Sequence, residues 1–127
     1  MANTGTAPSK ARRITGWILA GLITAMFIMS AIMKLIGSPQ ITAGFEKYGL
    51  HGRVLLIGTG EILSAILFII PATSSFGVLW LSAYLGGAIA THMEHGEPFI
   101  IPSVMLVVLW IANWLRSPEM FYSFRRR

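Results

Sequence analysis

Four polar side chains stand out because they lie inside or beside long apolar stretches of the sequence. Lys34 is near the end of the first stretch, Glu61 is inside the second, and Tyr84 and His92 belong to the third. A single charge placed in a membrane helix costs about 2.5–3.5 kcal/mol or more, so pairing or neutralisation is expected. An ammonium, a carboxylate, a phenol and an imidazole could together hold a polar head group, a quinone ring or a proton.

A metal site is the first alternative, because the run HMEHGE begins at His92. His92 and His95 are three residues apart and would share a helix face, with Glu94 and Glu97 beside them, and zinc sites use such ligands. The same stretch must also form a loop, and histidines three apart on one helix cannot bind opposite faces of a haem. We therefore predict no metal and no haem. The absence of cysteine excludes thiol chemistry and Cys-ligated metals.

The composition indicates that lipid surrounds most of the chain. Of the 127 residues, 54% are apolar and 12% are charged, whereas a soluble domain has about 25% charged residues. A chain this short cannot hide so much apolar surface from water. The net charge of +5 comes mainly from basic residues at the chain ends. Membrane topology explains that pattern better than nucleic-acid binding, which we do not expect.

Four apolar runs are long enough to be membrane-spanning helices, and together they make one domain. The domain covers 14–116, with runs at about 14–36, 54–70, 76–94 and 99–115. About 20 helical residues cross the hydrocarbon core, and continuous apolar runs favour helices over alternating strands. We therefore predict an all-α fold, an integral membrane four-helix bundle.

The basic residues predict that both ends of this bundle are cytoplasmic. The tail 1–13 contains one lysine and two arginines, Arg116 closes the last run, and the tail 117–127 ends in three arginines. The loop between the second and third runs has no charge. Because cytoplasmic segments carry an excess of Lys and Arg, the loop 37–53 is expected on the external side.

Helical periodicity and depth bring three of the polar side chains toward one place. Each of the first three runs has a face of small residues that also carries polar groups, and such faces pack against other membrane helices. At about 1.5 Å per residue, Lys34 lies near the external edge, Glu61 roughly 10 Å below it, and His92 at the edge again. A lysine stem could cover that distance. We therefore predict one hydrogen-bonded cluster of Lys34, Glu61 and His92 in the outer half of the bundle.

Four short motifs carry a resemblance to a known family. They are SAIMKLIGSP around Lys34, GFEKYGL in the first loop, IGTGEILSAILFIIP around Glu61, and LGGAIATHMEHGEP around His92. With these motifs the chain resembles the DoxX-like family of small four-span bacterial membrane proteins over nearly its whole length. The resemblance implies a bundle in the bacterial cytoplasmic (inner) membrane, an accessory place in a membrane redox complex, and quinone as the candidate cofactor. It implies no catalytic residues.

Two functions remain open at this point. In the first, Lys34, Glu61, Tyr84 and His92 line a head-group site in an accessory subunit linked to redox or quinone chemistry. In the second, the same cluster only fixes helix packing in a structural or chaperone-like membrane protein. No soluble-enzyme motif is present, so we expect no catalysis by the chain alone, although the sequence does not decide this. The expected partners are the lipid bilayer and proteins of a redox complex, with a second copy of the chain left open.

Overall fold

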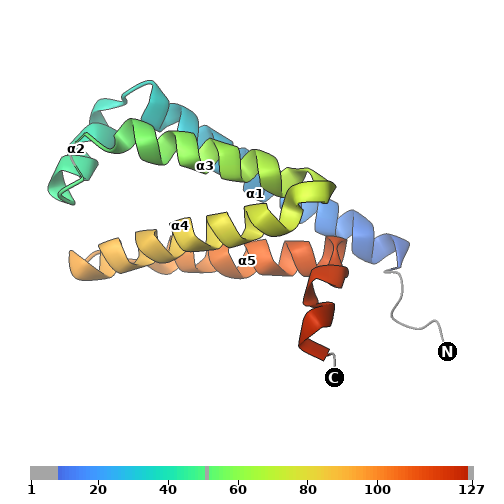
Figure 1. The fold of residues 1–127 in the computed structure, drawn as a ribbon. Helices are drawn as coiled ribbons and strands as arrows, with labels where there is room; N and C mark the ends of the chain where they lie inside the picture. Colours follow the sequence, from blue (N-terminus) through green and yellow to red (C-terminus); the bar gives the residue numbers. More distant parts are fainter. Residues whose placement is uncertain (1–8, 51, 126–127) are drawn as a thin grey trace.

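The computed structural model describes residues 9–50 and 52–125, and over these residues the chain is helical with no strand. Most of the expected N-terminal tail and the last two arginines lie outside this description. The elements, shown in Figure 1, are α1 (Lys10–Leu35), α2 (Pro39–Lys47), α3 (Val54–Ile69), η1 (Pro71–Thr73), α4 (Ser74–Glu94), α5 (Ile100–Arg116) and η2 (Pro118–Arg125).

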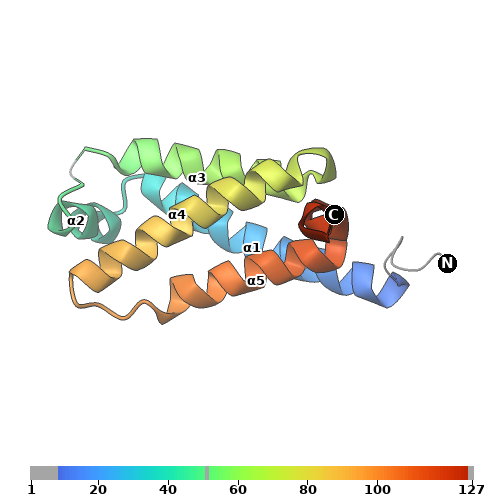
Figure 2. The same cartoon turned by 60° about the horizontal axis from the view of Figure 1, so that its bottom comes forward.

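The four long helices each pack against two others. α1 contacts α3 and α5, and α4 contacts the same two helices. Figure 2 shows α4 lying between α3 and α5, with α1 behind them. The pair α1 and α3 diverges from the pair α4 and α5 toward the end where α2 lies (Figure 1). The beginning of α1 and the segment η2 both lie at the opposite end, which we call the terminal end.

Apolar side chains cover the outside of these helices as well as the inside. The buried core uses small and medium residues together with two phenylalanines, Phe27 and Phe68. Exposed large apolar residues occur on every long helix, among them Leu22, Leu56 and Val107. In water such a surface would be strongly unfavourable, because burial of apolar area drives folding there. The pattern therefore fits a protein whose helices face lipid.

Among the described residues, two segments are long and apolar enough to cross a membrane. They are α1 and the segment Pro71–Glu94, with mean hydropathies of 2.1 and 1.2. α3 and α5 are shorter apolar helices of 16 and 17 residues. The helices therefore occupy all four apolar runs of the sequence, and two of them satisfy the length expected of a span.

Close helix contact depends on glycine at two positions. A Cβ added to Gly16 would lie 2.7 Å from the backbone nitrogen of Arg116, and one added to Gly77 would overlap the backbone of Phe68. Only glycine lets α1 approach α5, and α4 approach α3, at these points. Small residues have this role wherever membrane helices pack closely.

Arg116 lies next to the C-terminal tail in the sequence, but its side chain is buried between helices and not exposed. Its side chain donates to the carbonyl of Phe68 at 2.6 Å and to that of Ile69 at 3.4 Å, and a further bond of 3.1 Å goes to Asn113 Oδ1. The last carbonyls of a helix lack partners within the helix and carry partial negative charge. Arg116 therefore caps the end of α3 from α5.

Candidate functional site

A buried ion pair joins α1 to α3 in the half of the molecule nearer α2. Lys34 Nζ lies 2.9 Å from Glu61 Oε1, and the two side chains are 5% and 1% exposed. Ser30, one turn before Lys34, accepts a 2.6 Å bond from Lys34 Nζ and donates a 3.3 Å bond to the same Glu61 oxygen. Each charge is thus compensated within the protein, as expected for ionised groups away from water.

The local sequence explains why the pair forms. Ser30 and Lys34 are four residues apart, so they lie on one face of α1. On α3, Gly58 faces them, and a Cβ there would lie 3.0 Å from Lys34 Cβ. This close approach leaves the lysine stem running along α3 toward Glu61, as the depth argument predicted.

Tyr84 faces the ion pair from α4. Lys34 Nζ lies 5.6 Å from the centre of the Tyr84 ring, a cation–π distance. The same ring makes an edge contact with Phe27 of α1, with ring centres 6.0 Å apart. The structure therefore brings together Lys34, Glu61 and Tyr84, three of the four predicted residues.

His92 does not join this cluster, so that part of the prediction is wrong. His92 is eight residues beyond Tyr84 on α4, about 12 Å along the helix, which is too far for a shared hydrogen bond. The chain instead turns at Gly96, where φ is +68°, and places Glu97 back against His92. His92 Nδ1 lies 3.0 Å from Glu97 Oε1 and 3.4 Å from the Tyr48 hydroxyl.

Three residues that the sequence analysis did not place in the site complete this second cluster. Tyr48 donates a 2.6 Å bond to Glu97 Oε1, and Lys47 Nζ lies 2.5 Å from Glu97 Oε2. The Tyr48 ring also packs edge-on against His92 and His95. Lys47, Tyr48, His92 and Glu97, which we call the clasp, tie the end of α2 to the loop between α4 and α5.

The charges of the clasp shift two pKa values. The bond from Lys47, followed by that from Tyr48, lowers the pKa of Glu97 to about 2. The bond to Glu97, helped by partial burial, raises the pKa of Tyr48 to about 12. Both shifts favour the ionised carboxylate and the neutral phenol across the ordinary pH range. The Glu97 carboxylate therefore stays available as the acceptor that holds the end of α2.

A cavity of about 550 Å³ lies between the ion pair and the clasp. Lys34 and Tyr84 are at one end of its lining, and Tyr48 and His92 belong to the clasp. Its other lining residues are mostly apolar or small and come from α2, α3, α4 and the loop after α2: Gln40, Ile41, Gly44, Phe45, Leu50, Ile57, Ala83, Gly87, Ala88 and Thr91. An apolar pocket with few polar groups is typical of a small-molecule site.

Glu61 lies on a neighbouring hollow and not on the wall of this cavity. That hollow, of about 350 Å³, lies between α3 and α4 and is also lined by Ser64 and Trp80. The two spaces share Ile57, Ala83 and Tyr84, so Tyr84 stands between them. Among the described residues, no three His, Asp or Glu side chains converge as a metal site would require.

Comparison with known proteins gives one finding. A model of the DoxX-like family matches residues 18–112 of the chain. No curated protein and no solved structure gives a significant match. The matched range contains the ion pair, the cavity and the clasp.

The ion pair predicts strongly coupled losses of stability. Lys34→Met or Glu61→Gln alone leaves one buried charge without its partner, and each should lower the free energy of unfolding by about 3–5 kcal/mol. The double variant should lose clearly less than the sum, because it contains no orphan charge. Unfolding in detergent measures all three, with Arg53→Gln as an exposed-charge control. Additive losses would contradict the pairing.

Two groups of the clasp, Glu97 and Tyr48, should each contribute to the free energy of unfolding in a way that depends on pH. Because Glu97 titrates at about 2 when folded and ordinarily at 4.5, its contribution is complete above about pH 4.5 and disappears toward pH 2. Because Tyr48 titrates at about 12 and ordinarily at 10.0, its contribution is complete below pH 10 and is lost toward pH 12.

Thermal unfolding of the unaltered chain and of Glu97→Gln across pH tests this. The difference between them should shrink as the pH falls below about 4.5, where Glu97 loses its charge in the unfolded chain and then in the folded chain. Glu94→Gln is the matched control, because Glu94 is exposed and outside the clasp. A difference that persists unchanged at pH 2.5, or an equal effect of Glu94→Gln, would contradict the assignment.

Proposed function

The chain belongs to the DoxX-like family, and from this premise we propose that it crosses a bacterial cytoplasmic membrane four times and holds a quinone head group as an accessory subunit of a redox complex. The observation that carries the proposal is the cavity between Lys34, Tyr84 and the clasp. It is polar at the positions where a head group needs donors and apolar elsewhere.

Four features support the membrane location. α1 and Pro71–Glu94 have the length of a span. The 16 residues of α3 and 17 of α5 rise about 24–26 Å, close to the hydrocarbon thickness of about 30 Å. The outward surfaces of the helices are apolar. Three buried charges, Lys34, Glu61 and Arg116, have partners inside the protein.

The donors at the inner end of the cavity fit the carbonyl groups of a quinone. Lys34 is an ammonium held in place by Glu61 and Ser30, and the Tyr84 hydroxyl is a second type of donor at the same end. Phe45 and Tyr48 supply aromatic surface for a flat ring. The hollow between α3 and α4 adjoins this end and shares Tyr84 with the cavity as a wall residue.

The residues of the site suit binding and orientation better than catalysis by the chain alone. When bound, a quinone supplies two-electron, two-proton redox chemistry. Lys34 and Tyr84 would position its carbonyl oxygens, while Glu61 keeps Lys34 charged at Nζ. The apolar walls would exclude water. Electron donors or acceptors would therefore come from partner proteins, in keeping with an accessory subunit.

Quinone binding is tested by thermal unfolding of the purified protein with decylubiquinone or a short-tailed menaquinone. Either compound should raise the unfolding temperature in a saturable way. Tyr84→Phe keeps the ring contact with Phe27 but removes the hydroxyl, and should weaken binding roughly fivefold to tenfold. Ser103→Ala is the matched control, because it removes a hydroxyl of α5 that donates to the carbonyl of Phe99 at the start of that helix, outside the cavity lining. No saturable shift with either quinone would contradict the proposal.

The rival function has one observation in its favour. Lys34, Glu61 and Ser30 satisfy one another without any ligand, which is what a structural cluster requires. If the protein is only structural or chaperone-like, Glu61→Gln should lower the folded yield. Tyr84→Phe should then leave the response of the unfolding temperature to quinone unchanged. A loss of quinone response by Tyr84→Phe at normal folded yield would favour the head-group site.

A further inference from the structure

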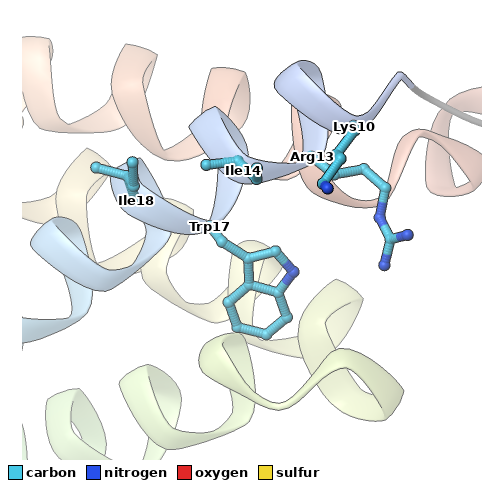
Figure 3. A pocket seen from close by; sticks show the side chains of 5 residues that line it. All are labelled: Lys10, Arg13, Ile14, Trp17 and Ile18. Atoms are coloured by element: carbon cyan, nitrogen blue, oxygen red, sulfur yellow. The ribbon is translucent and has the colours of Figure 1, made fainter.

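The first turns of α1 form an amphipathic hollow at the terminal end, far from the cavity of Lys34. It has a volume of about 830 Å³ and is lined by Lys10, Arg13, Ile14, Trp17 and Ile18. Figure 3 shows Arg13 and Trp17 extending in the same direction from the helix, with Ile14 and Ile18 following along it. The cationic side chains therefore lie at the start of the hollow, and the apolar side chains line it further along α1.

The two cationic side chains of the hollow, Lys10 and Arg13, have no partner among the described residues. Neighbouring Arg12 donates to the carbonyl of Trp114 at 3.1 Å and stacks over its ring at 4.3 Å. Within residues 9–50 and 52–125, by contrast, the side chains of Lys10 and Arg13 form no hydrogen bond or ion pair and are exposed. Arg116 is also engaged, as the cap of α3.

Acidic groups are scarce at this end of the molecule. The sequence has five acidic residues, all glutamates. Of these, Glu119 belongs to η2 at the terminal end, whereas the others belong to α2, α3, α4 and the loop after α4. Lys10 and Arg13 also sit at the N-terminal turn of a helix, where positive charge is unfavourable and an anion is favourable. The terminal end therefore has an unbalanced positive charge beside α1.

The apolar side of the hollow continues along the helix. Ile14 and Ile18 are 50% and 57% exposed, and Leu22 and Met26 extend the same stripe at steps of four residues. From Ile14 to Met26 the stripe is about 18 Å long, similar to the roughly 15 Å depth of one leaflet. Trp17 is held in place by Arg116, whose guanidinium lies 4.8 Å from its ring. The wall is thus long enough, and fixed enough, for one acyl chain.

We propose that this hollow binds one anionic phospholipid. Lys10 and Arg13 hold its phosphate, the Trp17 ring lies at the level of the glycerol, and an acyl chain follows Ile14, Ile18 and Leu22. A free phosphate would use only the cationic side, so the apolar side identifies the lipid as the occupant. The site requires the membrane location of the proposed function but is independent of quinone binding.

The test compares an anionic and a zwitterionic phospholipid that have the same acyl chains. Protein purified in detergent is titrated with dioleoyl phosphatidylglycerol or dioleoyl phosphatidylcholine, and bound lipid is counted by native mass spectrometry. One phosphatidylglycerol should be retained in preference to phosphatidylcholine. Each lost cation should weaken it roughly fivefold, so Lys10→Gln/Arg13→Gln should lose well over tenfold. Lys10→Arg/Arg13→Lys should bind normally, because both charges remain.

Two controls separate a specific site from general attraction. Arg53→Gln removes an exposed charge from the other end and should leave retention unchanged. Ile14→Ser/Ile18→Ser keeps both cations and should weaken the lipid, and inorganic phosphate should not compete. Equal losses for Arg13→Gln and Arg53→Gln, or competition by inorganic phosphate at millimolar concentration, would overturn the proposal. An unchanged quinone response in these variants keeps the two sites distinguishable.

Discussion

A charged side chain buried among these helices needs a partner within the protein, because the surrounding surfaces are apolar. Lys34 and Glu61 meet this constraint by pairing across α1 and α3. Arg116 meets it without a carboxylate, through the carbonyl groups at the end of α3 and the rings of Trp17 and Phe68. The helices can come close enough for these contacts because glycine stands at the crossing points. Lipid gives no hydrophobic driving force between helices, so close packing and these buried polar contacts hold them together.

The two ends of the molecule differ in charge and in shape. At the end of α2, the helix pairs diverge, a cavity opens, and the clasp holds α2 over it through Lys47, Tyr48 and Glu97. At the terminal end Arg116 joins α5 to α3, and the exposed cations Lys10 and Arg13 lie beside it on α1. The proposed quinone cavity and the proposed lipid hollow therefore lie at opposite ends of the helices.

Helical periodicity and depth were enough to predict the contact of Lys34 with Glu61 and the inward position of Tyr84. Periodicity placed Lys34 and Glu61 on facing sides of α1 and α3, and it placed Tyr84 on the interior face of α4. All three follow from the rise and turn of a regular helix, which the sequence pattern encodes directly. The membership of the DoxX-like family was recognisable from the same segments.

The errors concern residues whose position depends on irregular backbone. His92 was assigned to the ion pair because depth alone cannot show that Gly96 turns the chain and brings Glu97 against it. The contact of Tyr48 with the same carboxylate was not predicted, because it depends on where α2 ends. The carbonyl partners of Arg116 were not predicted either, because only the packing of α5 on α3 reveals them. Loop conformation and helix contact, which periodicity does not encode, decided all three.

Site-directed labelling tests the central claim, that these helices cross a membrane. The sequence has no cysteine, so single cysteines can be placed at Glu94 and Ala72, exposed at opposite ends of the segment η1–α4, and at the exposed Val107 on α5. In intact cells a membrane-impermeant maleimide should label Glu94→Cys at once and Ala72→Cys only after permeabilisation. Val107→Cys should resist it until detergent is added. Labelling of Ala72→Cys and Glu94→Cys from the same side, or of Val107→Cys in the intact membrane, would contradict the account.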